Sequence, residues 1–398
     1  MSLANRFRTN YLLLLLIALL LFGKSFTKYN LVGPLYLYDF LLVLLVITCF
    51  LRPWGKIKYK FALYFSIISV LYFLISLAAR YEIVPIDIIV RQFAICGYFI
   101  SAYIIAMAID FERNFDRIYW IVIVIAKASF LVQAFYILYL IILEQSLIEG
   151  YNYYSPLTVM GLLVFAIYTY FRNDISRLLK SALLITTVFF LFTVGHASAL
   201  LPMLVFLIMV IYLRLPKLIK ASILVFGIVL IIPILRFLPY VLDVNSAWRL
   251  VFWKQTLNRI IFDRFVIFGH GFGIEYVQRI TYDLFVTLFH THCKLDEEGE
   301  LYVKSVHNSF LAIALHVGFL PIAWLFVPVV RAYKLKRQVF ADNKMAVIFF
   351  SLIVLSVWCF FNVILELPHS SLYYWLFYFM LAAKLNDKYK NWMLSHER

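Results

Sequence analysis

Long runs of apolar residues, separated by short polar stretches, dominate the pattern of this 398-residue chain. Lipid offers no partners for free backbone groups, so an apolar run of about 20 residues crosses a bilayer as a helix. The runs therefore predict an all-α polytopic membrane protein with about 12 transmembrane helices. The expected spans are residues 10–26, 35–51, 61–79, 92–109, 118–143, 156–171, 181–195, 198–213, 221–238, 308–330, 345–362 and 371–383.

Basic residues are distributed unequally between the two sides that these spans define. With the N-terminus in the cytoplasm, the inner loops and both termini hold about 23 Lys and Arg residues, as the positive-inside rule requires. Spans 181–195 and 198–213 are short, and fusing them into one would destroy this asymmetry. The basic residues of the short outer loops are only Lys24, Lys28, Arg80 and Arg91.

This topology divides the chain into three parts. Residues 1–238 carry transmembrane helices 1–9, residues 239–307 form one large extracytoplasmic loop, and residues 308–398 carry helices 10–12 and a cytoplasmic tail. No internal repeat of about 20–50 residues is evident, which disfavours a transporter because many transporters are built from repeats. We expect the chemistry to lie in the loop, since it is the one substantial segment that must lie in water.

The loop contains an amphipathic stretch over residues 245–261. Its apolar side chains recur three and four residues apart, which predicts a helix with Asn245 or Ser246 as its N-cap. A Gly-x-Gly-x-Gly turn at 269–273 ends the helical pattern. Farther along, the polar interval becomes a strongly apolar helix just after His307. The apolar stripe of the first helix consists of Leu250, Trp253, Leu257, Ile260 and Ile261.

Composition and charge narrow the class of protein further. The chain is 65% hydrophobic and only 14% charged, with a mean hydropathy of +0.92. Soluble domains carry about 25% charged residues, so a soluble globular protein is excluded. The net charge of +15 would suit nucleic acid, but the basic residues lie where topology requires them, and we expect no nucleic-acid partner. The cysteines show neither disulfide nor zinc-ligand spacing.

The ordered motifs of the loop resemble those of the O-antigen ligase and O-antigen polymerase family. They are Arg249-x3-Trp253, the glycine turn at 269–273, and His-Asn-Ser-x-Leu from His307, followed by Gly-Phe-Leu from Gly318. The resemblance implies a GT-C-like integral membrane glycosyltransferase of the bacterial inner membrane that needs no cofactor. It also implies a polyprenyl-diphosphate-linked glycan as donor and a glycan or lipid A core as acceptor. Membrane lipids and a chain-length regulator or flippase would be its partners.

His307 and Arg249 are the expected catalytic residues. Histidine accepts a proton near neutral pH, which suits activation of a sugar hydroxyl, and the resemblance makes His307 this base. A guanidinium fork binds diphosphate oxygens, and Arg249 matches the family arginine, which implies that it stabilises the leaving group. The structural alternatives are an interfacial histidine and a solvated arginine. His316, half a turn out of phase with His307 and deeper along the helix, is expected to be packed in its interior.

Further residues are expected to bind the substrate, each against a structural alternative. Arg80 and Arg91 flank an outer loop, and Arg236 lies near the outer end of span nine. Each either faces lipid-linked phosphate or extends toward lipid headgroups. Asn308 is alternatively a helix N-cap, and Trp253 an interfacial anchor.

His196 occupies a Gly-His-Ala-Ser turn between spans seven and eight, where the family has a Ser-Arg pair proposed to hold the diphosphate. The arginine is absent here, so His196, Arg236 or Arg91 would have to supply the phosphate contact, or that contact does not exist. Lys127 lies inside span five and requires either a buried partner or a lipid contact.

The acidic run at residues 296–300 is the candidate metal site. Its composition is that of a solvated loop, so we expect no metal, with arginine in place of the cation. The glycine turn also lacks the preceding strand of a nucleotide-binding loop. The expected function is polymerisation of polyprenyl-diphosphate-linked repeat units of a surface polysaccharide, O-antigen or capsule. The alternatives are an O-antigen ligase, which transfers the glycan to lipid A core, and a lipid-linked glycan flippase, which is not an enzyme.

Overall fold

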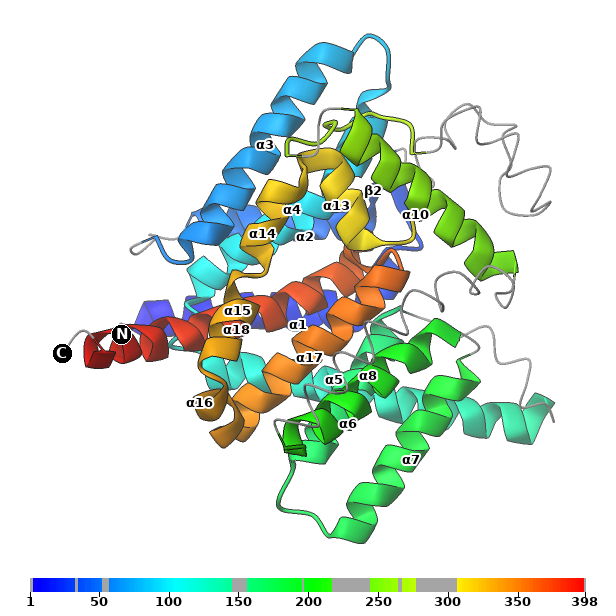
Figure 1. Cartoon of the computed structure of the whole chain (residues 1–398), viewed down its shortest axis with the longest axis vertical. Coiled ribbons are helices and arrows are strands. Elements are labelled where there is room, and N and C mark those ends of the chain that lie inside the picture. The colour runs from blue at the N-terminus through cyan, green and yellow to red at the C-terminus, as the bar shows by residue number, and fades with distance from the viewer. Residues whose placement is uncertain are drawn as a thin grey trace.

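The computed structural model describes residues 3–32, 35–51, 57–144, 156–194, 197–216, 244–263, 267–276 and 306–396. Within these ranges the chain is all-α, apart from one small antiparallel pair of strands (Figure 1). The α-helices are α1 (Leu3–Phe26), α2 (Leu37–Phe50), α3 (Lys60–Arg80), α4 (Ile86–Ile109), α5 (Phe115–Tyr139), α6 (Pro156–Phe171), α7 (Arg177–Thr193), α8 (Ala197–Arg214), α10 (Val244–Phe262), α13 (Ser309–Val317), α14 (Phe319–Leu325), α15 (Val327–Lys334), α16 (Lys336–Ala341), α17 (Asn343–Phe361) and α18 (Pro368–His396). The shorter elements are β1 (Asn30–Val32), β2 (Leu35–Tyr36), the π-helix η1 (Leu140–Glu144) and the 3₁₀-helix η3 (Ile364–Glu366).

Five helical stretches in the described part of the chain are long and apolar enough to cross a membrane. Helices α2, α6 and α8 add shorter apolar segments. The all-α class is confirmed, and these helices indicate a multi-pass membrane protein. A count of twelve spans stays a prediction, and the expected span at 221–238 lies outside the described residues. The five long stretches are Thr9–Phe26, Lys60–Arg80, Ile86–Ile109, Phe115–Ile142 and Asn343–Phe361.

Large apolar side chains face outward along several of these helices. Leu14 of α1, Ile75 of α3, Phe135 of α5 and Phe192 of α7 are each more than 60% exposed. A soluble protein rarely exposes extended apolar surface, because water solvates it poorly. The hydrocarbon of a bilayer solvates such side chains well, so this surface agrees with a membrane environment.

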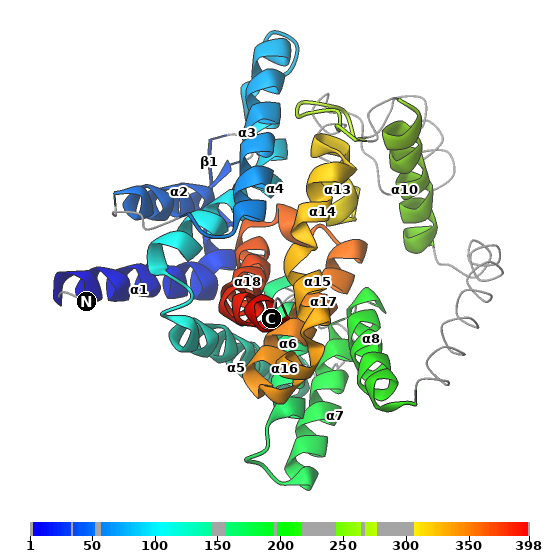
Figure 2. The same ribbon diagram turned by 60° about the vertical axis from the view of Figure 1, so that its left-hand side comes forward.

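Helix α18 lies at the centre of the bundle and packs against α1, α4, α5, α6 and α17 (Figure 2). Its side chains from Leu372 to Ala383 are all buried. Trp375 of α18 packs edge-on against Phe99 of α4, with ring centroids 4.8 Å apart. Aromatic contacts of this geometry add specificity to burial, so α18 sets the positions of the helices around it.

Segments that the positive-inside rule assigns to one side of the membrane contact one another in the structure. Glu112 accepts hydrogen bonds from Lys58 (2.7 Å) and from Asn386 near the C-terminus (3.1 Å). Arg117 of the same loop donates to Asn10 near the N-terminus (3.1 Å). Both chain ends lie on one side of the molecule, and α10 lies on the other (Figure 1). The grouping of these segments therefore agrees with the predicted topology, whose orientation stays a prediction.

The chain over 308–330 is not the single helix that its apolar pattern predicts. Gly318 adopts φ 85° and ψ 172°, a conformation open mainly to glycine, and ends α13 there. Pro328 then lies in the first turn of α15, where its missing N–H is tolerated. Three other helices agree with expectation, because α7 and α8 are separate and α10 covers the predicted amphipathic stretch.

Candidate functional site

The segment 267–276, which we call the glycine loop, docks against the end of α3. Arg80 donates hydrogen bonds to the carbonyl oxygens of His270 (3.0 Å) and Phe272. One turn earlier, Ser76 Oγ accepts a hydrogen bond from the Phe272 N–H (2.8 Å). The loop is neither helix nor strand, so side chains of α3 satisfy backbone groups that regular structure would otherwise pair. Arg80, expected to contact substrate, has at least this structural role.

Gln92 of α4 holds the second half of the glycine loop. Its Oε1 accepts hydrogen bonds from the N–H groups of Gly273 (2.8 Å) and Ile274 (3.2 Å), and its Nε2 donates to the Ile274 carbonyl (2.7 Å). The close fit requires glycine, since Gly271 has φ 78° and a Cβ there would lie 2.5 Å from Ser76 Oγ. The glycines thus let the loop approach α3 and α4 closely.

His316 of α13 also holds the glycine loop, through both nitrogens of its ring. Its Nδ1 lies 2.8 Å from the Gly271 carbonyl oxygen, and its Nε2 lies 2.8 Å from the Tyr276 hydroxyl. A carbonyl oxygen only accepts, so Nδ1 carries the proton and Nε2 accepts from the tyrosine. The ring is fully buried and stacks on Phe272, with centroids 4.8 Å apart. The expectation that His316 is packed in the helix interior is confirmed.

The C-terminal half of α10 is tied to the end of the same loop. Arg259 donates to the carbonyl oxygens of Glu275 (2.7 Å) and Tyr276 (3.3 Å). Burial, followed by the positive charge of Arg259, lowers the pKa of His270. The lowered pKa favours the neutral form of the His270 imidazole, whose Nε2 lies 3.8 Å from Asp263 Oδ2.

The N-terminal half of α10 brings Arg249 and the segment before α13 to the end of α17. Trp253 Nε1 donates to the Val306 carbonyl (2.9 Å), and its ring packs against Phe361, with centroids 5.6 Å apart. One turn earlier, Arg249 Nη1 donates to the Phe361 carbonyl over a long 3.4 Å. Because Val306 precedes His307, these contacts tie the segment that carries His307 to the helix that carries Arg249. Trp253 is an anchor between helices here, and its contact with substrate stays a prediction.

His307 is held in a left-handed backbone conformation, with φ 51°, immediately before α13. The residues after it are fixed: Asn308 caps α13 by accepting from the Leu311 N–H (3.0 Å), and Ser309 Oγ donates to the Asn362 carbonyl (2.9 Å). The N-cap interpretation of Asn308 is confirmed, and substrate binding by Asn308 stays a prediction. A non-glycine residue at positive φ is uncommon and persists where surrounding contacts impose it. The backbone of the half-buried His307 is therefore strained, and the contacts of Asn308 and Ser309 hold it in this conformation.

Arg91 of α4 lies among tyrosines and a carboxylate. Its guanidinium is 5.1 Å from the ring centre of Tyr36, and its Nη1 donates to the Tyr98 hydroxyl (3.4 Å). The Tyr98 hydroxyl in turn donates to Asp39 Oδ1 (2.7 Å). The carboxylates that act on Arg91 are thus Asp39, reached through Tyr98, and Glu366. Contact between Arg91 and a lipid phosphate stays a prediction.

Several other sequence-based expectations have different outcomes. His196, Arg236 and the acidic run at 296–300 lie outside the described residues. Lys127 lies over two aromatic rings, 5.0 Å from the ring centre of Trp120 and 5.3 Å from that of Tyr168. Cation–π contact therefore accounts for this charge within a predicted span.

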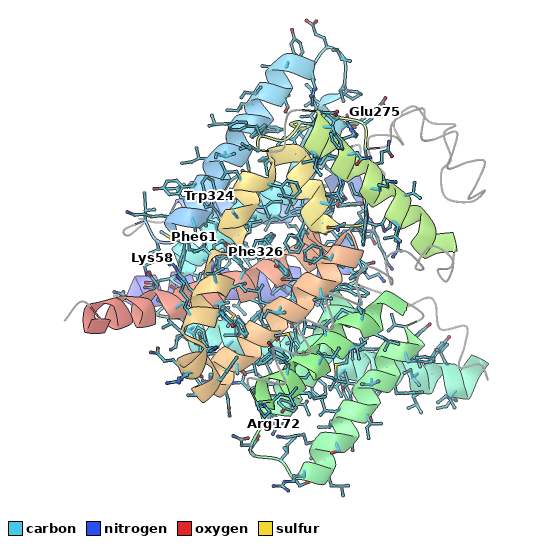
Figure 3. The ribbon with its side chains drawn as sticks, in the orientation of Figure 1. Lys58, Phe61, Arg172, Glu275, Trp324 and Phe326 are labelled. Carbon is cyan, nitrogen blue, oxygen red and sulfur yellow. The ribbon has the colours of Figure 1, made fainter. Side chains whose placement is uncertain are left out.

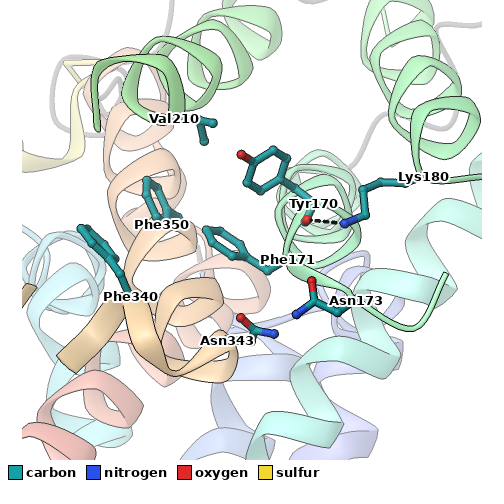
Figure 4. Close-up of a pocket in the computed structure, with 8 residues that line it drawn as sticks. All are labelled: Tyr170, Phe171, Asn173, Lys180, Val210, Phe340, Asn343 and Phe350. Carbon is teal, nitrogen blue, oxygen red and sulfur yellow. Dashed lines mark hydrogen bonds between the residues drawn. The ribbon is translucent and has the colours of Figure 1, made fainter. Parts of the chain in front are cut away.

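A cavity of about 460 Å³ lies between α6, α7, α8, α16 and α17 (Figure 4). Its lining includes Asn173 and Phe350, and Lys180 donates to the Tyr170 carbonyl (3.0 Å). The neighbouring Arg172 and the glycine-loop residue Glu275 lie at opposite ends of the molecule (Figure 3). The cavity is therefore separate from the cluster around Arg249 and His307.

Sequence reasoning missed the side chains that hold the glycine loop. Gln92 and Ser76 are polar residues inside apolar runs, which is the signal that marks a required hydrogen bond in a membrane helix. Tyr276 follows the glycines directly but carried no spacing signal. Among the described residues, no three His, Cys, Asp or Glu side chains gather as metal ligands would.

The chain was compared with known families and proteins. No protein-family model matches the sequence, and the search of curated proteins also gives no match. The function is therefore argued from the geometry around α10 and α13 together with the motif resemblance.

Proposed function

We propose that the chain is a membrane glycosyltransferase that polymerises polyprenyl-diphosphate-linked oligosaccharide repeat units into a surface polysaccharide, an O-antigen or a capsule. It acts in the bacterial inner membrane, with both chain ends in the cytoplasm and α10 on the outer side. This assignment rests on the resemblance of its motifs to O-antigen polymerases and ligases.

One structural observation supports the proposal: Arg249 and Trp253 of α10 contact the C-terminal end of α17, and Trp253 also holds Val306, the residue before His307. Trp253 bridges Val306 and Phe361, and Arg249 contacts Phe361. A permanent cation thus lies near the segment that carries a titratable base, at one end of an apolar helical bundle. Such a pair suits transfer from a lipid diphosphate, because the leaving group is anionic and the nucleophile is a neutral hydroxyl.

The reaction then follows from ordinary proton and charge chemistry. His307 removes the proton of the acceptor hydroxyl as its oxygen attacks the anomeric carbon of the donor. The bond between that carbon and the diphosphate oxygen breaks, and its electron pair stays on the diphosphate. Arg249 stabilises the charge that develops there. The donor's own phosphoester bond supplies the free energy, so no nucleotide is consumed.

The glycine loop has a positioning role in this scheme. It joins α3, α4, α10 and α13 through Arg80, Gln92, Arg259 and His316. The loop thus fixes α10, which carries Arg249, and α13, which begins just after His307, to the same set of helices. Precise placement of the reacting groups raises the reaction rate, because small misplacements slow the chemical step.

Transfer by the purified full-length protein in liposomes tests the proposal. With only a polyprenyl-diphosphate-linked repeat unit supplied, we expect oligomers on lipid diphosphate, together with released polyprenyl diphosphate. Product that forms only when lipid A core is added would assign a ligase instead. Movement of the lipid-linked glycan across the bilayer without any new glycosidic bond would assign a flippase.

The same liposome reaction in EDTA tests metal independence. We expect the transfer rate to stay unchanged, and a rate that is lost in EDTA and restored by Mg²⁺ would contradict metal independence.

A further inference from the structure

A second cavity, of about 340 Å³, lies at the C-terminal end of α1, between α5 and the start of α6. Its volume falls in the range of small-molecule sites, about 300–1,000 Å³. Two cations line it, Lys24 and Lys28, together with the hydroxyl side chains of Ser25, Ser129 and Thr158. No aspartate or glutamate is among its described lining residues. The polar wall of this cavity is thus cationic and rich in hydroxyl donors.

The remainder of the cavity wall is hydrocarbon. Leu21 of α1, Ile125 and Val132 of α5, and Leu157 of α6 line it. Leu21 and Val132 are also exposed on the outer surface of the helices, so the apolar wall continues onto the surface that would face lipid. A ligand that fits must therefore carry a negative head and an apolar chain.

The helices that form the cavity are packed closely. A Cβ at Gly161 of α6 would lie only 2.1 Å from Ser129 Oγ of α5, so glycine is what allows this approach. Ser129 is thereby held in the cavity wall beside α6. Lys24 lies in the last turn of α1 and Lys28 in the turn that follows it, and the two like charges act on each other. A bound anion would relieve that repulsion, and ammonium groups bind phosphate as point charges.

The cavity and the Arg249–His307 cluster lie at the same end of the bundle. Gly23, next to Lys24, packs against the first turn of α18, where its Cβ would lie 2.6 Å from His369 Cβ. A few residues before His369, Phe361 contacts Arg249. The segment 361–369 therefore connects the two sites.

We propose that this cavity binds the diphosphate end of a polyprenyl lipid, distinct from the donor bound at Arg249. Its isoprenoid chain lies along the apolar wall and leaves the protein into the membrane. The role of this lipid as the acceptor rests on the proposed polymerase function, because polymerisation needs two lipid-linked glycans at once. A ligase needs only one, so the site also bears on the choice between the two activities.

Binding of farnesyl diphosphate to the purified full-length protein tests the proposal. The protein is placed in nanodiscs of zwitterionic lipid and carries Arg249→Ala, which weakens the donor site. In this background, Lys24→Gln with Lys28→Gln is expected to weaken binding at least tenfold. Lys24→Arg with Lys28→Arg keeps both charges and should stay within about threefold, which controls for folding. Lys180→Gln, at the separate cavity of Figure 4, should leave binding unchanged.

Competitors identify the chemical source of the ligand. Free pyrophosphate is expected to compete only weakly with farnesyl diphosphate, because it lacks the isoprenoid chain. Phosphatidylglycerol is also expected to compete weakly, because it lacks the diphosphate. Equal competition by either, or unchanged binding in the double glutamine variant, would overturn the proposal. The assay measures no transfer, so its result stands apart from that of the liposome reaction. One outcome separates the two proposals. If the double glutamine variant loses farnesyl diphosphate binding but the protein transfers no glycan in the liposome reaction, the polymerase function is refuted and the lipid-binding site stands.

Discussion

At the scale of single residues, the backbone conformations of Gly318 and His307 decide how α13 begins and ends. His307 adopts φ 51° one residue before the N-cap, and Gly318 adopts φ 85° directly after the last turn. Glycine readily adopts the positive φ at Gly318, whereas His307 adopts its positive φ against local preference. Tertiary contacts impose both: Trp253 holds the residue before His307, and the glycine loop packs on Gly318.

Gly318→Ala is expected to destabilise the protein by at least about 2 kcal/mol, since strained positive φ alone costs about 1–3 kcal/mol for a residue with Cβ. The new Cβ would also lie 2.0 Å from the Ile267 carbonyl oxygen, so the glycine loop must move. Thermal unfolding in detergent, followed by tryptophan fluorescence, measures the change. Gly97→Ala is the matched control, because its Cβ would meet only the Phe93 ring at 3.6 Å. Equal midpoints for the two variants would contradict this reading of Gly318.

At the scale of elements, the glycine loop is held by polar side chains of helices that are otherwise apolar. Hydrophobic periodicity predicted α10 and the long apolar helices, because burial and lipid exposure follow local pattern. It could not predict that Gln92 bonds Gly273, since the two are separated by 181 positions in the chain. It also assigned 308–330 to one helix, because periodicity does not register the backbone conformation of one glycine.

Gln92→Leu is expected to loosen the glycine loop selectively. It removes the acceptor of the buried Gly273 and Ile274 N–H groups, and each unsatisfied group costs about 1–3 kcal/mol. Hydrogen exchange should therefore speed up by at least tenfold in residues 267–276 while the amides of α18 keep their protection. Gln338→Leu, at an exposed position of α16, serves as the control. Unchanged exchange in the glycine loop of Gln92→Leu would show that Gln92 does not hold it.

At the scale of the whole molecule, contacts between distant segments agree with the charge-based topology. The loop around Asp116 and the start of α17 are both predicted to be cytoplasmic, and Lys344 bonds Asp116 at 2.6 Å. Arg80 and the glycine loop are both predicted to be outside, and they are joined by two hydrogen bonds. Loop charge is the sequence signal that assigns segments to one side or the other. It could not place side chains within a side, because that depends on how the helices pack.

Cysteine labelling in intact cells tests this topology. In a variant whose native cysteines are replaced, a membrane-impermeant maleimide should label Glu275→Cys, and should label Asp174→Cys and Arg337→Cys only after permeabilisation. The last two positions are exposed and lie in predicted cytoplasmic loops. Labelling of Asp174→Cys in intact cells, with Glu275→Cys protected, would reverse the orientation and place Arg249 and His307 in the wrong compartment.

The most direct test of the account compares donor binding and glycan transfer for His307→Gly and Arg249→Ala. Glycine tolerates the φ of 51°, so His307→Gly removes the imidazole without adding backbone strain. We expect its transfer rate to fall about 10²–10⁴-fold with donor affinity nearly unchanged, as for loss of a general base. Arg249→Ala should lower both affinity and rate, and Arg249→Lys should restore part of each, because lysine keeps the charge without the fork. Near-normal transfer by His307→Gly would contradict the account, because the proposed base would then not be needed.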